Sequence, residues 1–498
     1  MKKMNLLAMS LVSAAALSFS SCSSNDDLTS GGGSNQAKVE GFYMTFAVQT
    51  PTSNGTRTQQ PTDAKNKVAG TAEETTITSG TFYLVNQKTQ KTVFTKNITA
   101  KELNNAAPES PTVGTTTTKI EVPVQDVDEG VTYTVYFLAN TTDETPWTSV
   151  FAPAVEKFTT TNKFDAGYAT DKKFVMFNQN DKNSKADQYT VTFSADNKNI
   201  ENPASVNKTI MLDRATARID KPTSVAEING AIPEGATELQ KKAINDAKAK
   251  VASITLTKHA ITNLSNKTNI MQKWDDATWT NLLLPEGITY MQQPKDLGGK
   301  FDLKNGEWFT ADEKHYVFEN TKEIPTTMYF EYTVALKPEQ FSDTPDCTDG
   351  TFYRYNGNIY RSIAAIFAAY ADQPILFGGK SAADLLGELK IKTEGEGTAA
   401  TKTIGATEEE LSTFRQAYTI EVFRAGKTYY SYIINDKWLG TNTIQRNTVY
   451  KLNVNNIFNV GADVPNGVPD ENKPMYYLNV EVSVNPWVLS TDDVSLGD

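Results

Sequence analysis

Apolar and polar residues alternate along much of the chain, a pattern that predicts β-strands with one buried face. The first clear case runs from residue 38 to residue 50. Its apolar side chains occupy every second position and are Phe42, Met44, Phe46 and Val48. We expect these four side chains to face a hydrophobic core and the strand itself to be buried.

Turn-rich polar segments separate further alternating runs in the first half of the chain. The predicted strands are 81–86, 92–96, 117–124, 133–139, 174–177, 189–193 and 209–219. Short strands at this spacing are typical of a β-sandwich or barrel. Between the first strand and the second, residues 51–70 are polar and without periodicity, so they predict an exposed loop.

The second half repeats the pattern after a segment rich in Pro, Gly and small polar residues. Its predicted strands are 251–262, 327–336, 418–424, 429–434, 449–457 and 476–484. Helices are predicted at 238–248, at 363–370 from apolar residues at helical spacing, and from an N-cap at Ser381 to Lys390. The role of the segment 347–390, which holds the last two, cannot be assigned from the sequence.

The length of 498 residues exceeds what one hydrophobic core usually serves. We therefore predict a mostly β protein with two β-sandwich domains of transthyretin-like type and a few short helices inserted in the second. The boundary is placed near Asp220, with domains at 58–220 and 221–498.

The chain begins with the features of an export signal. Lys2 and Lys3 precede an apolar run from residue 6 to residue 19 that is too short to span a bilayer. The run ends in Phe19-Ser20-Ser21-Cys22, which resembles the lipobox of bacterial lipoproteins. Residues 1–21 are thus predicted to be a signal peptide and Cys22 to be acylated. The alternative is an ordinary signal peptide with an incidental cysteine.

Charge and residue composition argue against several partners and reactions. The formal net charge of -11 and the pI near 5.0 argue against nucleic acid as a partner. The chain has two histidines, and Cys347 is the one cysteine left once Cys22 is lipidated. Neither histidine has a local pattern that ties it to Cys347 as a nucleophile, so we predict no enzyme. The nearby acidic residues lack the spacing of a calcium loop, and we expect no metal and no cofactor. These residues are Asp343, Asp346 and Asp349.

The C-terminal end carries a last alternating run over residues 476–484. Pro486 is expected to end this strand. Spaced apolar residues follow it, namely Trp487, Leu489, Val494 and Leu496. Two interpretations stay open from periodicity alone: this segment folds back as an edge strand of its own domain, or it is given to another subunit.

Several segments together resemble the type V fimbrillin family, the pilins of Bacteroidetes, and particularly the shaft subunits of short, Mfa-type fimbriae. The resemblance covers nearly the whole chain. It rests on the lipobox at Cys22, on Met44-Thr45-Phe46-Ala47-Val48, on the strand from Tyr133 to Asn140, on Asp213-Arg214-Ala215-Thr216-Ala217-Arg218, on Arg446-Asn447-Thr448-Val449-Tyr450 and on Val484-Asn485-Pro486-Trp487.

The resemblance implies a structural subunit of a cell-surface fimbria that supports adhesion. Such a subunit is exported as an outer-membrane lipoprotein, and an arginine-specific protease then cuts the loop after its first strand. Loss of that strand leaves a groove that a strand from another subunit fills, either a copy of this chain or another fimbrial protein. Residues 22–57 would be the removed propeptide, and Trp487, Leu489, Val494 and Leu496 would form the donor strand.

One arginine stands out as the cleavage site. Arg57, followed by Thr58, is the only arginine before Asp213 and lies in the polar loop behind the first strand. The alternative is that Arg57 is merely a solvated loop residue. The loop has no second basic residue until Lys65, so cleavage elsewhere or by another protease also stays open.

Two other functions compete with a shaft subunit. A tip or accessory subunit would accept a strand without needing to donate one, and the C-terminal segment discriminates between the two. A surface lipoprotein that binds glycans would share the leader and the sandwich domains, and exposed aromatic side chains would stack on sugars. The candidates for such stacking are Trp147, Trp274, Trp279, Trp308 and Trp438.

Overall fold

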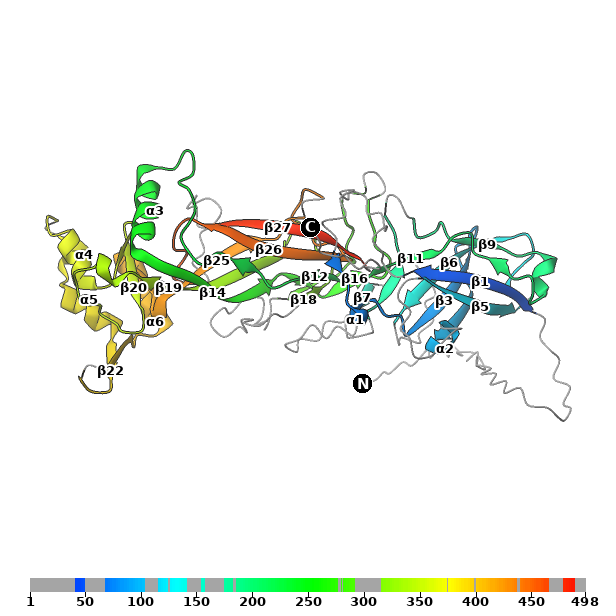
Figure 1. Ribbon diagram of the computed structural model, residues 1–498, viewed down its shortest axis with the longest axis horizontal. Helices are drawn as coiled ribbons and strands as arrows, with labels where there is room; N and C mark the ends of the chain where they lie inside the picture. The colour runs from blue at the N-terminus through cyan, green and yellow to red at the C-terminus, as the bar shows by residue number, and fades with distance from the viewer. Residues whose placement is uncertain are drawn as a thin grey trace, which may run out of the picture. The chain divides into compact units, whose positions relative to one another are not determined.

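The first strands of the computed structural model build a sheet around the predicted first strand. The model describes residues 41–49, 68–103, 115–123, 126–140, 154–156, 174–181, 185–275, 279, 281–291, 315–373, 375–397, 400–436, 439–464 and 478–488. The strand order in this first sheet is β10-β1-β11-β8-β6-β3-β4, with β5 also paired to β1 and β9 to β6. Figure 1 labels β1, β3, β5, β6, β9 and β11 of these strands. These strands are β1 (Gly41–Gln49), β3 (Ser79–Asn86), β4 (Thr92–Thr99), β5 (Thr115–Pro123), β6 (Thr132–Ala139), β8 (Met176–Asn178), β9 (Thr190–Thr192), β10 (Ala204–Ser205) and β11 (Ile210–Arg214).

Two further sheets pack face to face in the second half. One has the order β18-β12-β26-β27-β2, with β13 on β26, and the other has the order β14-β19-β25. Apolar side chains from both sheets, such as Leu452 and Phe330, share one core, which makes this a β-sandwich. The strands are β2 (Val68–Ala69), β12 (Ala217–Ile219), β13 (Thr223–Ser224), β14 (Val251–Thr262), β18 (His315–Val317), β19 (Thr327–Leu336), β25 (Lys427–Ile433), β26 (Thr448–Ile457) and β27 (Leu478–Val488).

Smaller strand pairs complete the β structure. β7 (Ala154–Glu156) pairs with β16 (Lys267–Asn269), and β15 (Leu264–Ser265) pairs with β17 (Tyr290–Met291). β20 (Phe352–Tyr355) lies between β21 (Asn358–Tyr360) and β24 (Glu421–Phe423), while β22 (Ile391–Glu394) and β23 (Thr401–Ile404) form a hairpin. The mostly β architecture that the sequence predicts is thus confirmed. The described residues fall within one compact unit, residues 40–498, and the division at residue 220 stays a prediction.

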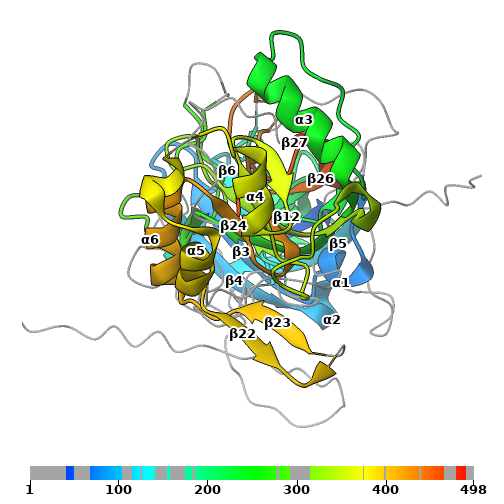
Figure 2. The same ribbon diagram turned by 90° about the vertical axis from the view of Figure 1, so that its left-hand side faces the viewer.

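The helices of the described residues are short, and two of them lie in the segment 347–390 that could not be assigned from the sequence. Figure 2 shows α4, α5 and α6 grouped together, with the β22–β23 hairpin below them. The α-helices are α1 (Ala72–Thr75), α2 (Ala100–Leu103), α3 (Glu238–Lys250), α4 (Ile363–Ala369), α5 (Ala382–Leu389) and α6 (Glu408–Tyr418). Short 3₁₀ turns are Ala195–Lys198, Pro338–Gln340, Leu376–Gly379 and Arg424–Gly426. None of the helices described is long and apolar enough to cross a membrane.

Capping residues explain where the helices start. Ser381 accepts a hydrogen bond from the backbone N–H of Asp384, as its predicted N-cap role requires. Thr407 caps α6 in the same way, and three glutamates follow it in the first turn. The predicted strand 418–424 is therefore wrong in its first part, because Tyr418 completes a helical face with Leu411 and Phe414.

The two histidines of the chain contact each other across the β-sandwich, one from each of its sheets. His259 on β14 and His315 on β18 place their Nε2 atoms 2.9 Å apart, and both side chains are buried. Burial lowers the pKa of His259 to about 3, with His315 and Lys221 adding to the effect, and it lowers the pKa of His315 to about 4. Both rings are therefore neutral in the folded protein near neutral pH.

The histidine pair predicts an acid-sensitive stability. In the unfolded chain both side chains titrate near 6.5, so the unfolded state binds more protons as the pH falls from 6.5 toward 4. The histidine contribution to the free energy of unfolding is fully present above about pH 6.5. It falls as the pH drops from 6.5 toward 4, by at most about 1.4 kcal/mol per pH unit for each histidine. Urea unfolding at about pH 7.5 and about pH 5 measures the loss. The double variant His259→Gln/His315→Gln should show a smaller difference between the two pH values, and an equal difference would contradict this account.

Candidate functional site

The strand β1 is an interior strand, hydrogen-bonded along both of its edges. On one side it pairs antiparallel with β5 over its whole length, from Gly41 opposite Pro123 to Gln49 opposite Thr115. On the other side it pairs parallel with β10 and β11, through Met44 opposite Ala204 and Val48 opposite Ile210. Loss of β1 would therefore unpair backbone groups on three neighbouring strands at once.

The inward side chains of β1 form part of the first core. The exposed fractions of Phe42, Met44, Phe46 and Val48 are 1%, 0%, 2% and 0%. The residues between them are half-buried, so the predicted period of two is confirmed. These four side chains belong to the same core cluster as Phe82 and Phe137. A chain without β1 would expose this core to water.

The core forms an aromatic subsite under Phe46. The ring centroid of Phe46 lies 4.9 Å from that of Phe82 and 5.8 Å from that of Phe137. Phe137 can pack this closely only because residue 80 is a glycine. A Cβ atom at Gly80 would lie only 2.2 Å from the Phe137 ring. Glycine is thus required here for a close approach.

A second aromatic subsite lies under Phe42. The ring of Phe42 is 5.3 Å from that of Phe193, and Nζ of Lys198 lies 5.4 Å above the Phe42 ring. Such ring pairs and cation contacts add to plain burial. Each subsite is built by residues far from β1 in the sequence, and periodicity could not identify them.

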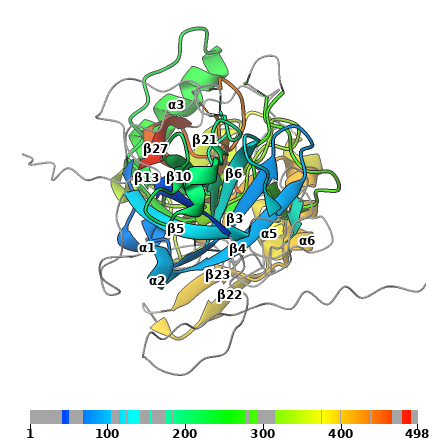
Figure 3. The same ribbon diagram turned by 90° about the vertical axis from the view of Figure 1, so that its right-hand side faces the viewer.

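The chain downstream of the predicted cleavage loop is held in place by contacts that do not involve β1. β2 pairs parallel with the C-terminal strand β27, with Val68 opposite Trp487 and Ala69 opposite Val488. β2 begins at residue 68, eleven positions after Arg57. A cut between β1 and β2 would thus leave the downstream end tied to the sheet that contains β27. Figure 3 labels β27 and β13 of this sheet.

Glu74 is a second anchor of this downstream segment. Its side chain is 1% exposed and accepts hydrogen bonds from Arg218 and from the hydroxyl of Tyr316, at 3.0 Å and 2.7 Å. Its backbone carbonyl accepts a hydrogen bond from Nε of Arg214 at 2.8 Å. Sequence analysis missed Glu74, because the two adjacent glutamates in Ala72-Glu73-Glu74-Thr75 give no sign that one of them is buried.

Two of the sequence segments that carry the family resemblance meet here. Asn447 accepts a hydrogen bond from Arg214, donates one to Asp213, and donates its backbone N–H to the carbonyl of Thr216, each at 2.8 Å. Burial lowers the pKa of Arg214 to about 9, while Glu74 and Asp213 act in the opposite direction. These segments form a buried polar junction beside the first residues of β12.

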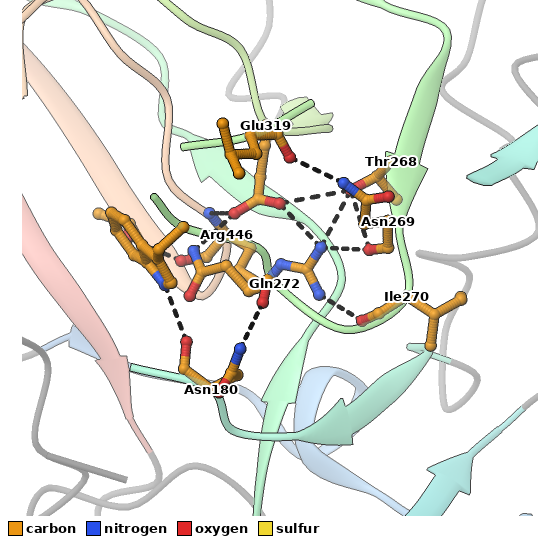
Figure 4. Close-up of polar contacts among 10 residues, drawn as sticks. Asn180, Thr268, Asn269, Ile270, Gln272, Glu319 and Arg446 are labelled. Atoms are coloured by element: carbon orange, nitrogen blue, oxygen red, sulfur yellow. Dashed lines mark hydrogen bonds and ion pairs between the residues drawn. The ribbon is translucent and has the colours of Figure 1, made fainter. Parts of the chain in front are cut away.

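Arg446 extends this junction toward the segment 268–274 (Figure 4). It forms a buried ion pair with Glu319 at 2.8 Å and donates to the carbonyls of Asn269 and Ile270. Gln272 donates to the other carboxylate oxygen of Glu319 at 2.6 Å. A paired and hydrogen-bonded buried charge of this kind specifies packing, and nothing in its geometry activates a nucleophile or a proton donor.

Trp274 belongs to the same junction. Its Nε1–H donates to the carbonyl of Asn180 at 2.8 Å, while the Asn180 side chain donates to the carbonyl of Gln272 at 2.7 Å. Only 6% of Trp274 is exposed. This tryptophan is therefore a packing residue and offers no ring face to a sugar. Of the other candidate tryptophans, Trp279 is half-buried, and Trp147, Trp308 and Trp438 lie outside the described residues.

Cys347 and its acidic neighbours have structural partners. Cys347 is buried in the helical core, and burial raises the pKa of its thiol to about 12, so it carries no thiolate near neutral pH. Asp346 accepts the backbone N–H of Ile363 at 2.7 Å, and Asp343 accepts the hydroxyl of Ser362 at 2.6 Å. Within the part of the chain that the structure describes, no group of three or more metal-ligating side chains occurs.

The last described strand corrects one expectation about the C-terminus. β27 continues through Pro486, which lies opposite Thr448, and ends at Val488. β27 pairs with β26 on one side, and on its other side the pairing with β2 starts only at Trp487. Pro486 therefore has no partner strand on that second side, where its missing N–H costs no hydrogen bond. Trp487 is therefore part of the chain's own sheet. Cys22, Arg57, Thr58, Leu489, Val494 and Leu496 lie outside the described residues.

Sequence comparison identifies one family in the C-terminal part of the chain. Residues 421–493 match the family model described as major fimbrial subunit protein type IV, fimbrillin, C-terminal. This match agrees with the fimbrillin resemblance over these residues. No curated protein matches the chain significantly.

Solved structures similar to the chain include proteins named as fimbrial. A fimbrilin from Porphyromonas gingivalis has 15% sequence identity and a TM-score of 0.42, with 90% of this chain and 99% of that chain covered. The tip fimbrial protein Mfa3 from the same organism has 12% identity and a TM-score of 0.35, with coverage of 89% and 100%. A candidate cell adhesion protein from Parabacteroides distasonis has 14% identity and a TM-score of 0.44, with coverage of 91% and 100%. Similarities this low decide nothing about the function of this chain.

Proposed function

We propose that this chain, whose residues 421–493 match the fimbrillin family model, is a fimbrial subunit activated by removal of its first strand. It is made as a lipoprotein anchored to the outer membrane through Cys22. An arginine-specific protease cuts after Arg57, and the mature subunit starts at Thr58. The subunit then joins copies of itself and other fimbrial subunits in a surface fibre that supports adhesion.

The position of β1 is the observation that supports this proposal. β1 is hydrogen-bonded on both edges and contributes four buried apolar side chains to the core. It is nevertheless joined to the chain downstream of it through the single segment 50–67, which contains Arg57. One cut in that loop leaves β1 held by non-covalent contacts alone.

The energetics favour replacement of β1 by another strand. Burial of a large apolar side chain contributes roughly 1.5 to 3 kcal/mol, so a subunit without β1 loses several kcal/mol of burial. It also exposes unpaired backbone groups on β5 and on β10 and β11. A strand added from another subunit restores both the apolar burial and the backbone hydrogen bonds, so assembly needs no external energy source.

The body left after the cut is expected to stay folded. The β-sandwich has its own core. The chain downstream of the cut is fixed by the pairing of β2 with β27 and by the ion pair of Glu74 with Arg218. These contacts would keep the new N-terminal segment on the subunit while β1 departs.

The C-terminal tail is the proposed donor, with one change from the sequence-based expectation. Because Trp487 and Val488 belong to β27, the donated segment starts at Leu489 and presents Val494 and Leu496. The same observation favours a second candidate function, a tip or accessory subunit that accepts a strand and donates none.

Truncation of the tail tests the donor and separates the two functions. A chain that ends at Val488, cut at Arg57, is expected to remain monomeric on its own, yet to add to one end of fibres made by the full-length protein. Gel filtration and electron microscopy measure both outcomes. Val494→Asp/Leu496→Asp should behave like the truncation, and Ser495→Asp, which lies between them on the opposite face of an extended strand, is the matched control that should polymerise normally. Normal fibres from the truncated chain would overturn the donor role of the tail, and a full-length cut chain that forms no fibres would favour the tip or accessory function.

A further inference from the structure

The space that β1 fills differs from one inward position to the next. Phe42 and Phe46 lie in aromatic surroundings, four residues apart, whereas Met44 and Val48 are flexible or small aliphatic side chains. Alternate side chains of an added strand fill such pockets and give the interaction its specificity. A groove left by β1 would therefore prefer some strands over others.

The subsite under Phe46 is the most restrictive of the four. Phe82 and Phe137 are fully buried, and their ring centroids lie 4.9 Å and 5.8 Å from that of Phe46. The Phe137 ring itself leans on Gly80, where a Cβ atom would lie 2.2 Å away. Rings positioned in this way leave a space that another ring fills, and a smaller side chain would leave a cavity in a close-packed core.

The C-terminal tail of this chain contains no ring for this subsite. Residues 489–498 read Leu-Ser-Thr-Asp-Asp-Val-Ser-Leu-Gly-Asp, without Phe, Tyr or Trp. In an extended strand Val494 and Leu496 can take neighbouring inward positions, and the next inward position toward the N-terminus is Asp492. In either direction, the tail places an aliphatic or charged side chain where β1 places a phenylalanine.

We infer that the Phe46 subsite is the specificity-determining pocket of the groove and that it selects a donor strand with an aromatic side chain at this position. The preferred donor is thus a strand of another fimbrial subunit, with rings four residues apart on its inward face. The tail of this chain is the weaker ligand for its own groove. This inference rests on the proposed function, because the groove opens only when β1 leaves.

Peptide binding to the opened subunit tests the inference. The full chain is cut after Arg57, residues up to 57 are removed in mild urea, and binding is measured by fluorescence anisotropy. A peptide of residues 40–50 should bind tightly, and its Phe46→Leu variant should bind at least about tenfold more weakly, since loss of the ring leaves a cavity behind. The Gln49→Ala peptide is the matched control and should bind as the parent does.

A second pair of peptides tests the tail directly. A peptide of residues 489–498 should bind more weakly than the same peptide with Val494→Phe or Leu496→Phe, by about tenfold for the better of the two. In the protein, Phe82→Leu should reduce the preference for the ring without abolishing binding. Equal affinities of the parent peptide of residues 40–50 and its Phe46→Leu variant would overturn the inference and leave the proposed function intact. Failure of every peptide to bind, that of residues 40–50 included, would overturn the open groove and with it the proposed function.

Discussion

Replacing Phe46 with alanine is expected to lower the free energy of unfolding of the uncut chain by about 3–5 kcal/mol. The Phe46 side chain is 2% exposed and packs against the buried rings of Phe82 and Phe137, so its removal leaves a cavity between them. The cost combines lost burial with a cavity in the first core. Urea unfolding monitored by far-UV circular dichroism measures the change.

A substitution on the opposite face of the same strand provides the control. Gln49 is half-buried and points away from the core, so Gln49→Ala should change the free energy of unfolding by only about 0.5 kcal/mol. A Phe46→Ala chain as stable as the Gln49→Ala chain would mean that β1 is not part of the folded core. The burial that makes the proposed groove a strong acceptor would then be missing.

Much of the β structure could be predicted because alternation is a local signal. Strands β14 and β19 begin and end at the predicted residues, 251–262 and 327–336. The buried face of β1 was predicted as well, since a period of two assigns side chains to faces without knowledge of the partner strands. The N-cap at Ser381 likewise depends only on residues within one helical turn.

The remaining features depend on contacts between distant residues. β1 pairs with residues 115–123, 204–205 and 210–211, and no local pattern specifies such partners or their register. Glu74 is buried only because Arg218 and Tyr316 surround it. Residue 418, predicted as the start of a strand, is the end of α6. Pro486 stays within β27 because the pairing of β27 with β2 starts only at the next residue, Trp487.

The loop residue Arg57 is expected to control assembly completely. In Arg57→Ala the arginine-specific cut is lost, β1 stays covalently attached, and the chain competes for its own groove at a very high effective concentration. No polymer should form, although the folded chain keeps its stability. Arg57→Lys retains the positive charge and removes the arginine, so it should fail in the same way. Lys65→Ala removes a charge from the same loop and should assemble normally.

Mass spectrometry of the N-terminus of surface-assembled material tests the central claim most directly. The account predicts that assembled wild-type chains start at Thr58, and that Arg57→Ala yields neither this start nor a polymer. Assembled wild-type material that starts at an acylated Cys22 would contradict strand removal as the trigger, and it would favour an anchored or glycan-binding lipoprotein instead.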